Sequence, residues 1–264
     1  MKILLIGDIV GSPGRDAVKK IVPELRKKRC LDFVIANAEN IAGGSGLTPE
    51  TADELLNSEV DALTSGDHIW KKKEIYEKLN KDHRILRPAN YPESCPGRGA
   101  ACIKNSSGKI IGVINVLGRV FMDHADGCPF RTVEKALKEL SKTTNIILVD
   151  IHAEATSEKI ALGRFVDGKA SAIFGTHTHV QTADEKVLPQ GTAYITDLGM
   201  TGPQDSVIGR KVGSIIEHFM TCMPTKFEIG DKDVELQGAI VEIDEKSGKA
   251  LSIERIKEKL ENYL

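Results

Sequence analysis

Short apolar strands alternate with helical segments over most of this chain, and that alternation limits the folds open to it. Apolar runs bounded by turn residues predict strands at 2–7, 33–36, 62–65, 145–150, 170–174 and 193–196. Apolar residues at helical spacing predict helices at 16–28, 49–56, 74–79, 131–140 and 212–220, with Thr48 as the cap of the second. A repeated strand–helix order is typical of an α/β protein with parallel strands.

The middle and the end of the chain depart from this order. Residues 100–104 and 109–117 flank a turn at 105–108, which predicts an antiparallel hairpin, and further strands are predicted in the run 227–256. We therefore expect an α/β fold of two mixed sheets flanked by helices. The 264 residues, 41% of them hydrophobic, suffice for one sizeable core, so we expect a single domain over 1–264.

Polar side chains that could bind a metal or a substrate follow five of the predicted strands. They are Asp8, Glu39, Asn40, Asp67, His68, His152, His177 and His179. In open α/β sheets, ligands bind at the carboxyl ends of the strands. Each residue alone has an ordinary structural explanation: Asp8 would cap a turn, and His152 would be a hydrogen-bonded core histidine. Because five strand ends carry such residues, we expect one site at this edge.

The segment 175–179, Gly-Thr-His-Thr-His, is the most specific part of this set. In an extended segment, side chains two residues apart share a face, which would turn His177 and His179 the same way. Gly175 would let the backbone turn tightly enough to aim both imidazoles at one point. Neutral imidazole is the commonest metal ligand, although two ordinary histidines of a surface loop would give the same pattern.

The donor types in this set predict a metal centre. Even without His68, three carboxylates, one amide and three imidazoles are too many donors for one tetrahedral zinc ion. Two metal ions suit them better, and oxygen and imidazole donors without thiolate favour iron, manganese or zinc. Two metals about 3.5–4 Å apart clamp an in-line displacement at phosphorus and activate a water molecule. Metal-dependent hydrolysis of a phosphoester is therefore the predicted chemistry.

Composition argues against several other classes of protein. The net charge of −2 gives no positive field to hold a nucleic-acid polymer. The first apolar run is too short for a signal peptide and no stretch approaches a membrane span, so we expect a cytoplasmic protein with no membrane partner. Five cysteines without a CxxC pair predict reduced thiols, not a disulfide framework or a zinc–thiolate site.

The order of the motifs resembles the calcineurin-like metallophosphoesterases, and in detail their bacterial YmdB-like branch. The motifs are Gly7-Asp8, Glu39-Asn40, Gly66-Asp67-His68, His152 and 175–179, and the segments 7–15, 87–90, 154–159 and 196–203 also resemble that branch. The likeness implies a four-layer α/β/β/α sandwich and a dinuclear metal centre often described with iron. It also implies phosphodiesterase activity on a small-molecule substrate, a 2',3'- or 3',5'-cyclic nucleotide.

The resemblance further implies a role for each site residue. Asp8, Asn40 and His179 would hold one metal, Glu39 would bridge, Asp67, His152 and His177 would hold the other, and His68 would be the catalytic acid. The branch normally has asparagine where this chain has Asp67. That difference bears on metal preference and on rate.

Two other functions stay open on the sequence alone. The same metals would serve a phosphomonoesterase or a protein phosphatase. Alternatively, the chain would be a regulatory protein that binds a nucleotide with little turnover. The sequence also leaves the oligomeric state open, with a homo-oligomer among the options.

Overall fold

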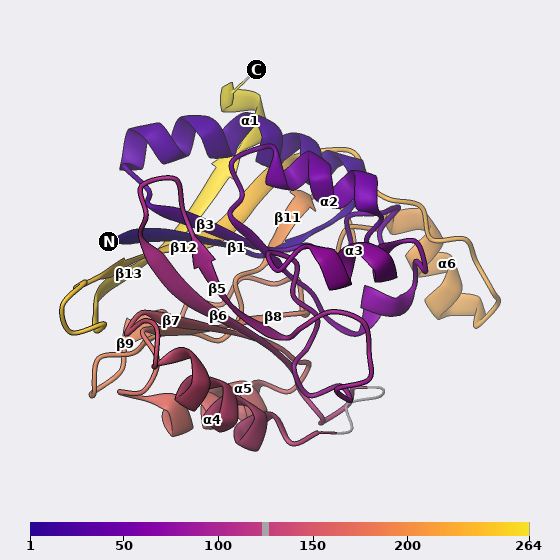
Figure 1. The fold of residues 1–264 in the computed structure, drawn as a ribbon. Helices are drawn as coiled ribbons and strands as arrows, with labels where there is room; N and C mark the ends of the chain where they lie inside the picture. The colour runs from indigo at the N-terminus through magenta and orange to yellow at the C-terminus, as the bar shows by residue number, and fades with distance from the viewer. Residues whose placement is uncertain (123–126, 264) are drawn as a thin grey trace.

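Two β-sheets packed face to face form the centre of the molecule, and helices cover the outer face of each (Figure 1). The computed structural model describes residues 1–122 and 127–263. Within those residues, no helix combines the length and the apolar character needed to cross a membrane.

The first sheet has seven strands. They are β1 (Lys2–Ile6), β2 (Asp8–Ile9), β3 (Phe33–Asn37), β4 (Ala62–Thr64), β11 (Met200–Pro203), β12 (Val234–Ile243) and β13 (Ala250–Lys259). The order is β2-β11-β12-β1-β3-β4, and β13 also pairs with β12. Strands β1, β3 and β4 are parallel, whereas β12 runs antiparallel to β1. The sheet is therefore mixed, and the carboxyl ends of β1, β3 and β4 meet at one edge.

The second sheet has six strands in the order β5-β6-β7-β8-β10-β9. They are β5 (Ala100–Lys104), β6 (Ile110–Leu117), β7 (Ile147–His152), β8 (Ala172–Thr176), β9 (Lys186–Val187) and β10 (Ala193–Ile195). Strands β5 and β6 form the predicted antiparallel hairpin. Strands β6, β7, β8 and β10 are parallel, so their carboxyl ends also share an edge.

The helices divide between the two outer faces. Helices α1 (Gly11–Arg29), α2 (Pro49–Leu56) and α3 (Ile75–Lys81) cover the first sheet, and α4 (Pro129–Leu140) and α5 (Thr156–Val166) cover the second (Figure 1). Helix α6 (Val212–Thr221) lies to one side, and two short 3₁₀ helices, η1 (Asp67–Trp70) and η2 (Leu260–Tyr263), complete the elements. Thr48 caps α2 with the predicted hydrogen bond from the backbone N–H of Thr51.

Alternation of side chains along the strands builds the layers. In β1, Leu4 and Ile6 belong to the apolar core under α1, whereas Ile3 and Leu5 belong to the core between the two sheets. This follows from the period of two in a strand, which sends neighbouring side chains to opposite faces. A third core joins the second sheet to α4 and α5. The expected four-layer α/β/β/α sandwich is confirmed.

Three local expectations were wrong. Helix α1 begins at Gly11, not at residue 16. Residues 11–15 contain glycine and proline, which form helices poorly, so nothing in the sequence marks them as part of the helix. In the structure they form its first turn, where Gly14 packs against the backbone of Thr201. Helix α5 was not predicted, because its buried face includes Glu158 and Lys159 and so breaks the apolar period. The run 227–233 lies outside the strands, which begin only at β12.

One buried carboxylate joins the two sheets just below their shared edge. Asp150 of β7 accepts hydrogen bonds from Asn37 Nδ2 (3.1 Å) and Thr64 Oγ1, the last residues of β3 and β4 in the first sheet. It also accepts one from Thr176 Oγ1 (2.8 Å), the last residue of β8 in its own sheet. Burial raises the pKa of Asp150 to about 6, against these hydrogen bonds, which favour the ionised form.

We expect Asp150→Asn to change how stability depends on pH. The pKa of Asp150 is higher in the folded protein, about 6, than its ordinary value of 3.8, so its protonated form favours folding. That contribution is present below about pH 4 and is lost as the pH rises through about 6. Relative to Asp150→Asn, the wild type should therefore lose roughly 3 kcal/mol of unfolding free energy between about pH 4 and pH 7. Urea unfolding of both proteins with a chelator present measures this, and a difference that stays constant with pH would contradict it.

Candidate metal centre

All eight residues singled out from the sequence lie together where the strands of both sheets end. Those of the first sheet are Asp8, which begins β2 directly after β1, Glu39 and Asn40 after β3, and Asp67 and His68 at the start of η1 after β4. Those of the second sheet are His152, the last residue of β7, and His177 and His179 after β8. Contacts between these side chains divide seven of them into two adjoining groups, and His68 contacts one member of each, Glu39 and Asn40.

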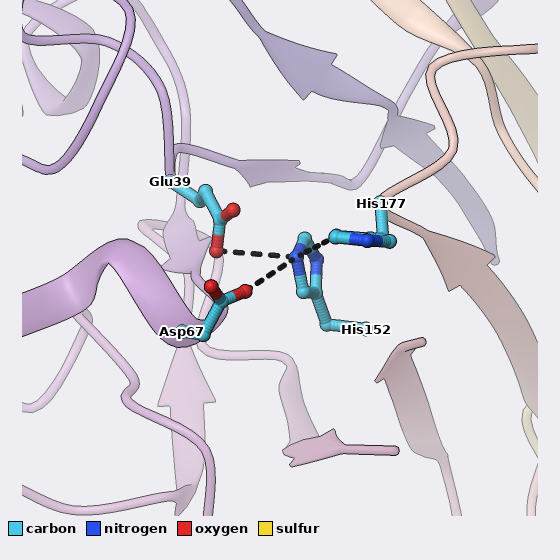
Figure 2. A group of neighbouring side chains, drawn as sticks. All are labelled: Glu39, Asp67, His152 and His177. Atoms are coloured by element: carbon cyan, nitrogen blue, oxygen red, sulfur yellow. Dashed lines mark hydrogen bonds and ion pairs between the residues drawn. The ribbon is translucent and has the colours of Figure 1, made fainter. Parts of the chain in front are cut away.

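The first group consists of Glu39, Asp67, His152 and His177, whose side chains point toward one another in Figure 2. One donor atom from each lies within 4.8 Å of the others. His152 Nε2 lies 3.2 Å from Glu39 Oε2, 3.7 Å from Asp67 Oδ1 and 3.0 Å from His177 Nδ1. Donor atoms around a tetrahedral ion with bonds near 2.1 Å are separated by about 3.4 Å. The spacing therefore suits one metal ion.

The second group consists of Asp8, Asn40 and His179. His179 Nε2 lies 3.7 Å from Asp8 Oδ1 and 3.3 Å from Asn40 Nδ2. Asp8 Oδ1 is also 3.8 Å from His152 Nδ1, which joins this group to the first. The oxygen of Asn40 instead accepts a hydrogen bond from His68 Nδ1 at 2.9 Å. Asn40 would need its amide turned over to offer oxygen to an ion beside His179.

Two carboxylate oxygens at this site lack the partner that buried oxygens normally have. Asp8 Oδ1 and Asp67 Oδ1 are buried and accept no hydrogen bond from the part of the chain that the structure describes. A buried polar atom without a partner costs about 1–3 kcal/mol, and more when it is charged. A bound cation would satisfy both oxygens. The types of donor residue and these two oxygens without hydrogen bonds therefore fit a metal site.

The charges of the first group depend on one another. Burial favours a higher pKa for Glu39, but the adjacent His152 outweighs it and lowers the pKa to about 2. Burial opposes protonation of His152, but Glu39 and Asp8 outweigh it and raise the pKa to about 10. Burial, together with the charge of His152, lowers the pKa of His177 to about 3. Without a metal, the group thus holds an ionised Glu39, a protonated His152 and a neutral His177.

Hydrogen bonds fix which nitrogen of two rings faces the site. Thr176 Oγ1 donates to Asp150, so it accepts from His152 Nδ1 at 2.9 Å, and that nitrogen keeps its proton. His179 Nδ1 likewise donates to the carbonyl oxygen of Ile208 at 3.1 Å. Nε2 is therefore the nitrogen that each ring offers to a metal. Such outer hydrogen bonds set the tautomer and orientation of metal-binding histidines.

The loop that carries the two histidines after β8 does not have the predicted geometry. Gly175 lies within β8, and a Cβ there would meet the carbonyl oxygen of Thr196 at 1.8 Å, so this glycine permits close packing and not a turn. The histidines themselves adopt positive φ, 102° at His177 and 64° at His179. They point into different groups instead of to one point. Positive φ at non-glycine residues is strained and concentrates at functional sites.

A buried ion pair holds this loop in place. Lys159 Nζ of α5 donates to Asp197 Oδ2 at 2.7 Å and to the carbonyl oxygen of Thr176 at 2.8 Å, and both charged side chains are about 1% exposed. Asp197 Oδ2 also accepts from Thr178 Oγ1 at 2.8 Å, between the two histidines. Removing one partner of such a pair typically costs about 3–5 kcal/mol, because a buried charge is left alone.

Several residues that support the site were not predicted from the sequence. Glu154 Oε2 lies 3.2 Å from His177 Nε2, on the side of the ring away from His152. Asp150 had one visible signal, since it is a charged residue within an otherwise apolar strand. Lys159 and Asp197 lie in two segments that resemble the YmdB-like branch, 154–159 and 196–203, but their pairing had no signal because the two residues are 38 positions apart.

A cavity of about 340 Å³ opens over the two groups. Its walls include Glu39, Asn40, His68, His177 and His179. This volume falls in the range of about 300–1,000 Å³ that is usual for small-molecule sites. A larger and shallower hollow of about 620 Å³ beside α3 contains none of the eight residues, so the smaller cavity is the candidate substrate site.

Comparison with known proteins gives close matches over nearly the whole chain. A family model described as "YmdB-like protein" matches residues 4–256. A Bacillus subtilis (strain 168) protein named 2',3'-cyclic-nucleotide 2'-phosphodiesterase is 49% identical over 256 residues, which cover 97% of this chain and 96% of that protein.

Two solved structures share the fold. A hypothetical protein from Thermus thermophilus superposes with a TM-score of 0.90 at 38% identity, over 98% of this chain and 99% of that one. A structure described as a novel phosphatase, from Mycoplasma pneumoniae, has a TM-score of 0.90 at 33% identity, over 98% of this chain and 93% of that one.

We expect Thr176→Val to weaken metal binding about 10- to 100-fold, because the hydroxyl that holds His152 Nδ1 is lost. Thr64→Val is the matched control: Thr64 also donates to Asp150 but is not a partner of His152. Competition between each purified protein and a chelator for Mn²⁺ or Zn²⁺ gives the affinities. Equal affinities in the two variants would show that this hydroxyl does not set the ligand.

Proposed function

Since the chain belongs to the YmdB-like protein family, we propose that it is a metal-dependent phosphodiesterase that hydrolyses cyclic nucleotides. A phosphodiesterase and a phosphatase among its relatives make the chain a phosphoester hydrolase. The observation that carries the finer proposal is the group of Glu39, Asp67, His152 and His177, with two buried carboxylate oxygens that accept no hydrogen bond, under a cavity of small-molecule size. The name of the Bacillus subtilis relative favours a 2',3'-cyclic over a 3',5'-cyclic substrate.

The two groups of side chains correspond to two metal ions in this proposal. Asp8, Asn40 and His179 would hold one ion, and Asp67, His152 and His177 the other, with Glu39 between them. Two ions supply a nucleophilic water at neutral pH and neutralise the charge that builds up around phosphorus. Oxygen and imidazole donors suit iron, manganese or zinc, and the resemblance to the YmdB-like branch favours iron among them.

Glu39 is well placed to bridge, because its two oxygens face different neighbours. Oε2 lies 3.2 Å from His152 Nε2, and Oε1 lies 3.2 Å from His68 Nδ1. The side chain is buried and ionised. It therefore offers a buried negative charge with one oxygen, Oε2, in the first group and the other, Oε1, free to turn from His68 toward a second ion.

Asp67 is a metal ligand in this proposal, and the orientation of its side chain toward the site supports that role. Its Oδ1 faces His152 Nε2 at 3.7 Å and is one of the bare buried oxygens. With Asp8 and Glu39, it brings three carboxylates to the centre. An additional carboxylate in place of a neutral amide strengthens the hold on cations and reduces their net positive charge.

His68 is assigned as the general acid. Its side chain is 33% exposed and lines the cavity, so a substrate oxygen has access to it. Without a metal, Nδ1 donates to Asn40 Oδ1. If Asn40 turned its oxygen to an ion, Glu39 Oε1, 3.2 Å from Nδ1, would remain as the acceptor that orients the ring. From there, His68 would protonate the ribose oxygen that leaves phosphorus.

The proposal predicts which substrates are cleaved and what is formed. Purified protein supplied with iron or manganese should hydrolyse 2',3'-cyclic AMP faster than p-nitrophenyl phosphate, because a diester is the proposed substrate. Breaking the bond to O2' should leave a nucleoside 3'-phosphate, identifiable by chromatography. A chelator should abolish the reaction, and added metal should restore it.

Other outcomes of that assay would favour the alternatives. Faster cleavage of the monoester would favour a phosphomonoesterase, as the name of the Mycoplasma pneumoniae relative suggests. Tight nucleotide binding without turnover under every metal tried would indicate a regulatory protein.

We expect His68→Ala to lower turnover about 10²- to 10⁴-fold at unchanged metal content, which is the usual contribution of a general acid. His177→Ala should instead lose metal, because its Nδ1 belongs to the donor group. Elemental analysis of both variants, with rates on a cyclic nucleotide, separates the two roles. If His68→Ala lost its metals or kept full activity, the assignment would be wrong.

A further inference from the structure

One charged side chain that lines the cavity over the two candidate metal-binding groups has no partner of opposite charge among the described residues. Among the described residues that line this cavity, Arg210 is the one lysine or arginine, and it faces a wall that also contains Glu39 and Glu154. Nothing in the proposed chemistry so far uses it. Arg210 follows β11 and stands just before α6.

Two backbone carbonyls hold the Arg210 guanidinium against the cavity wall. Nη2 donates to the carbonyl oxygen of Gly44, and Nη1 donates to that of Phe227 at 3.3 Å. Gly44 has φ of +83°, and a Cβ there would lie 2.5 Å from Arg210 Nη1. A glycine at this position thus lets the guanidinium lie directly on the loop that follows Asn40.

No carboxylate of residues 1–122 or 127–263 lies within 4.0 Å of the Arg210 guanidinium. This differs from Arg15, Arg26 and Arg84, which pair with Glu54, Asp61 and Asp82 at 2.6, 3.1 and 2.7 Å. Burial lowers the pKa of Arg210, which reflects a half-buried charge without a counterion. Burying a positive charge in this way costs free energy unless an anion pairs with it.

We propose that Arg210 binds the non-bridging phosphate oxygens of the substrate in this cavity, an inference that rests on the proposed phosphodiesterase function. A guanidinium carries five N–H donors in a planar fork, and the two carbonyls occupy two of them. The remaining donors suit paired contacts to a phosphate group. Arg210 is therefore a substrate-binding residue and holds the phosphate before the reaction as well as after it.

The same loop also contacts the metal groups, which places the phosphate contact beside them. The carbonyl oxygen of Ile208, two residues before Arg210, accepts the hydrogen bond from His179 Nδ1. The loop is pinned by further backbone hydrogen bonds, from Gly230 to Gly209 at 2.9 Å and between Val207 and Arg210. The guanidinium is thus positioned relative to His179 before substrate arrives.

Arg210→Gln tests the proposal, with Lys211→Gln as the matched control. Lys211 is the next residue and carries the same charge, but it is half-exposed, pairs with Glu228 Oε2 at 2.7 Å and does not line the cavity. In the metal-loaded protein, Arg210→Gln should raise KM for the cyclic nucleotide about 10- to 100-fold and change kcat much less, as expected for a lost charged hydrogen bond. Lys211→Gln should leave both near the wild-type values. Arg210→Lys keeps the charge without the fork and should fall between.

Binding of inorganic phosphate, measured by calorimetry on the same metal-loaded proteins, tests Arg210 even if the wild type cleaves no cyclic nucleotide. Its affinity should fall by a similar factor in Arg210→Gln and hold in Lys211→Gln. Equal phosphate affinity in Arg210→Gln and wild type, at equal metal content, would overturn the proposal. Loss of metal in Arg210→Gln would also overturn it, because Arg210 would then hold the loop around His179 in place and would not bind phosphate.

Discussion

The hydrogen bonds of Asp150 determine how the two halves of the candidate site meet. Apolar packing holds the sheets together but is non-directional, so it alone would not fix their alignment to the accuracy that a metal site needs. Asp150 supplies direction, because it joins the ends of β3 and β4 to the end of β8 through Asn37, Thr64 and Thr176. Glu39 follows the first of these strands by two residues, and His177 follows β8 directly. The alignment of the sheets is thus set beside the residues that depend on it.

The sequence was informative where structure is local. Apolar strand segments, the Thr48 cap and the polar residues after each strand all depend on neighbours in the chain. Two mixed sheets with flanking helices and a candidate site at one edge could be predicted from them, whereas the four layers were implied by the family resemblance. Helix α5 was missed because Glu158 and Lys159 face inward. Glu158 accepts hydrogen bonds from the backbone N–H groups of Arg119 and Val120, and Lys159 pairs with Asp197, so only the folded chain shows why these charges are buried.

The candidate site shows the same division. The set of candidate residues could be predicted, because each lies at or just after a strand end. Their arrangement could not, since the positive φ of His177 and His179 results from anchors distant in sequence: Asp8, whose carboxylate accepts from the His177 backbone N–H at 2.9 Å, and Ile208. Arg210 also escaped notice, because its place in the cavity depends on Gly44, 166 residues earlier in the chain.

The ion pair of Glu39 and His152 has a consequence for the order of events as the protein matures. In the metal-free chain, the proton on His152 Nε2 stands where a cation would stand and offsets the charge of Glu39. The nascent protein can therefore close its core around these groups with their charges largely compensated. Loading of the proposed metal would then be an exchange, in which the incoming ion displaces a proton from a folded protein.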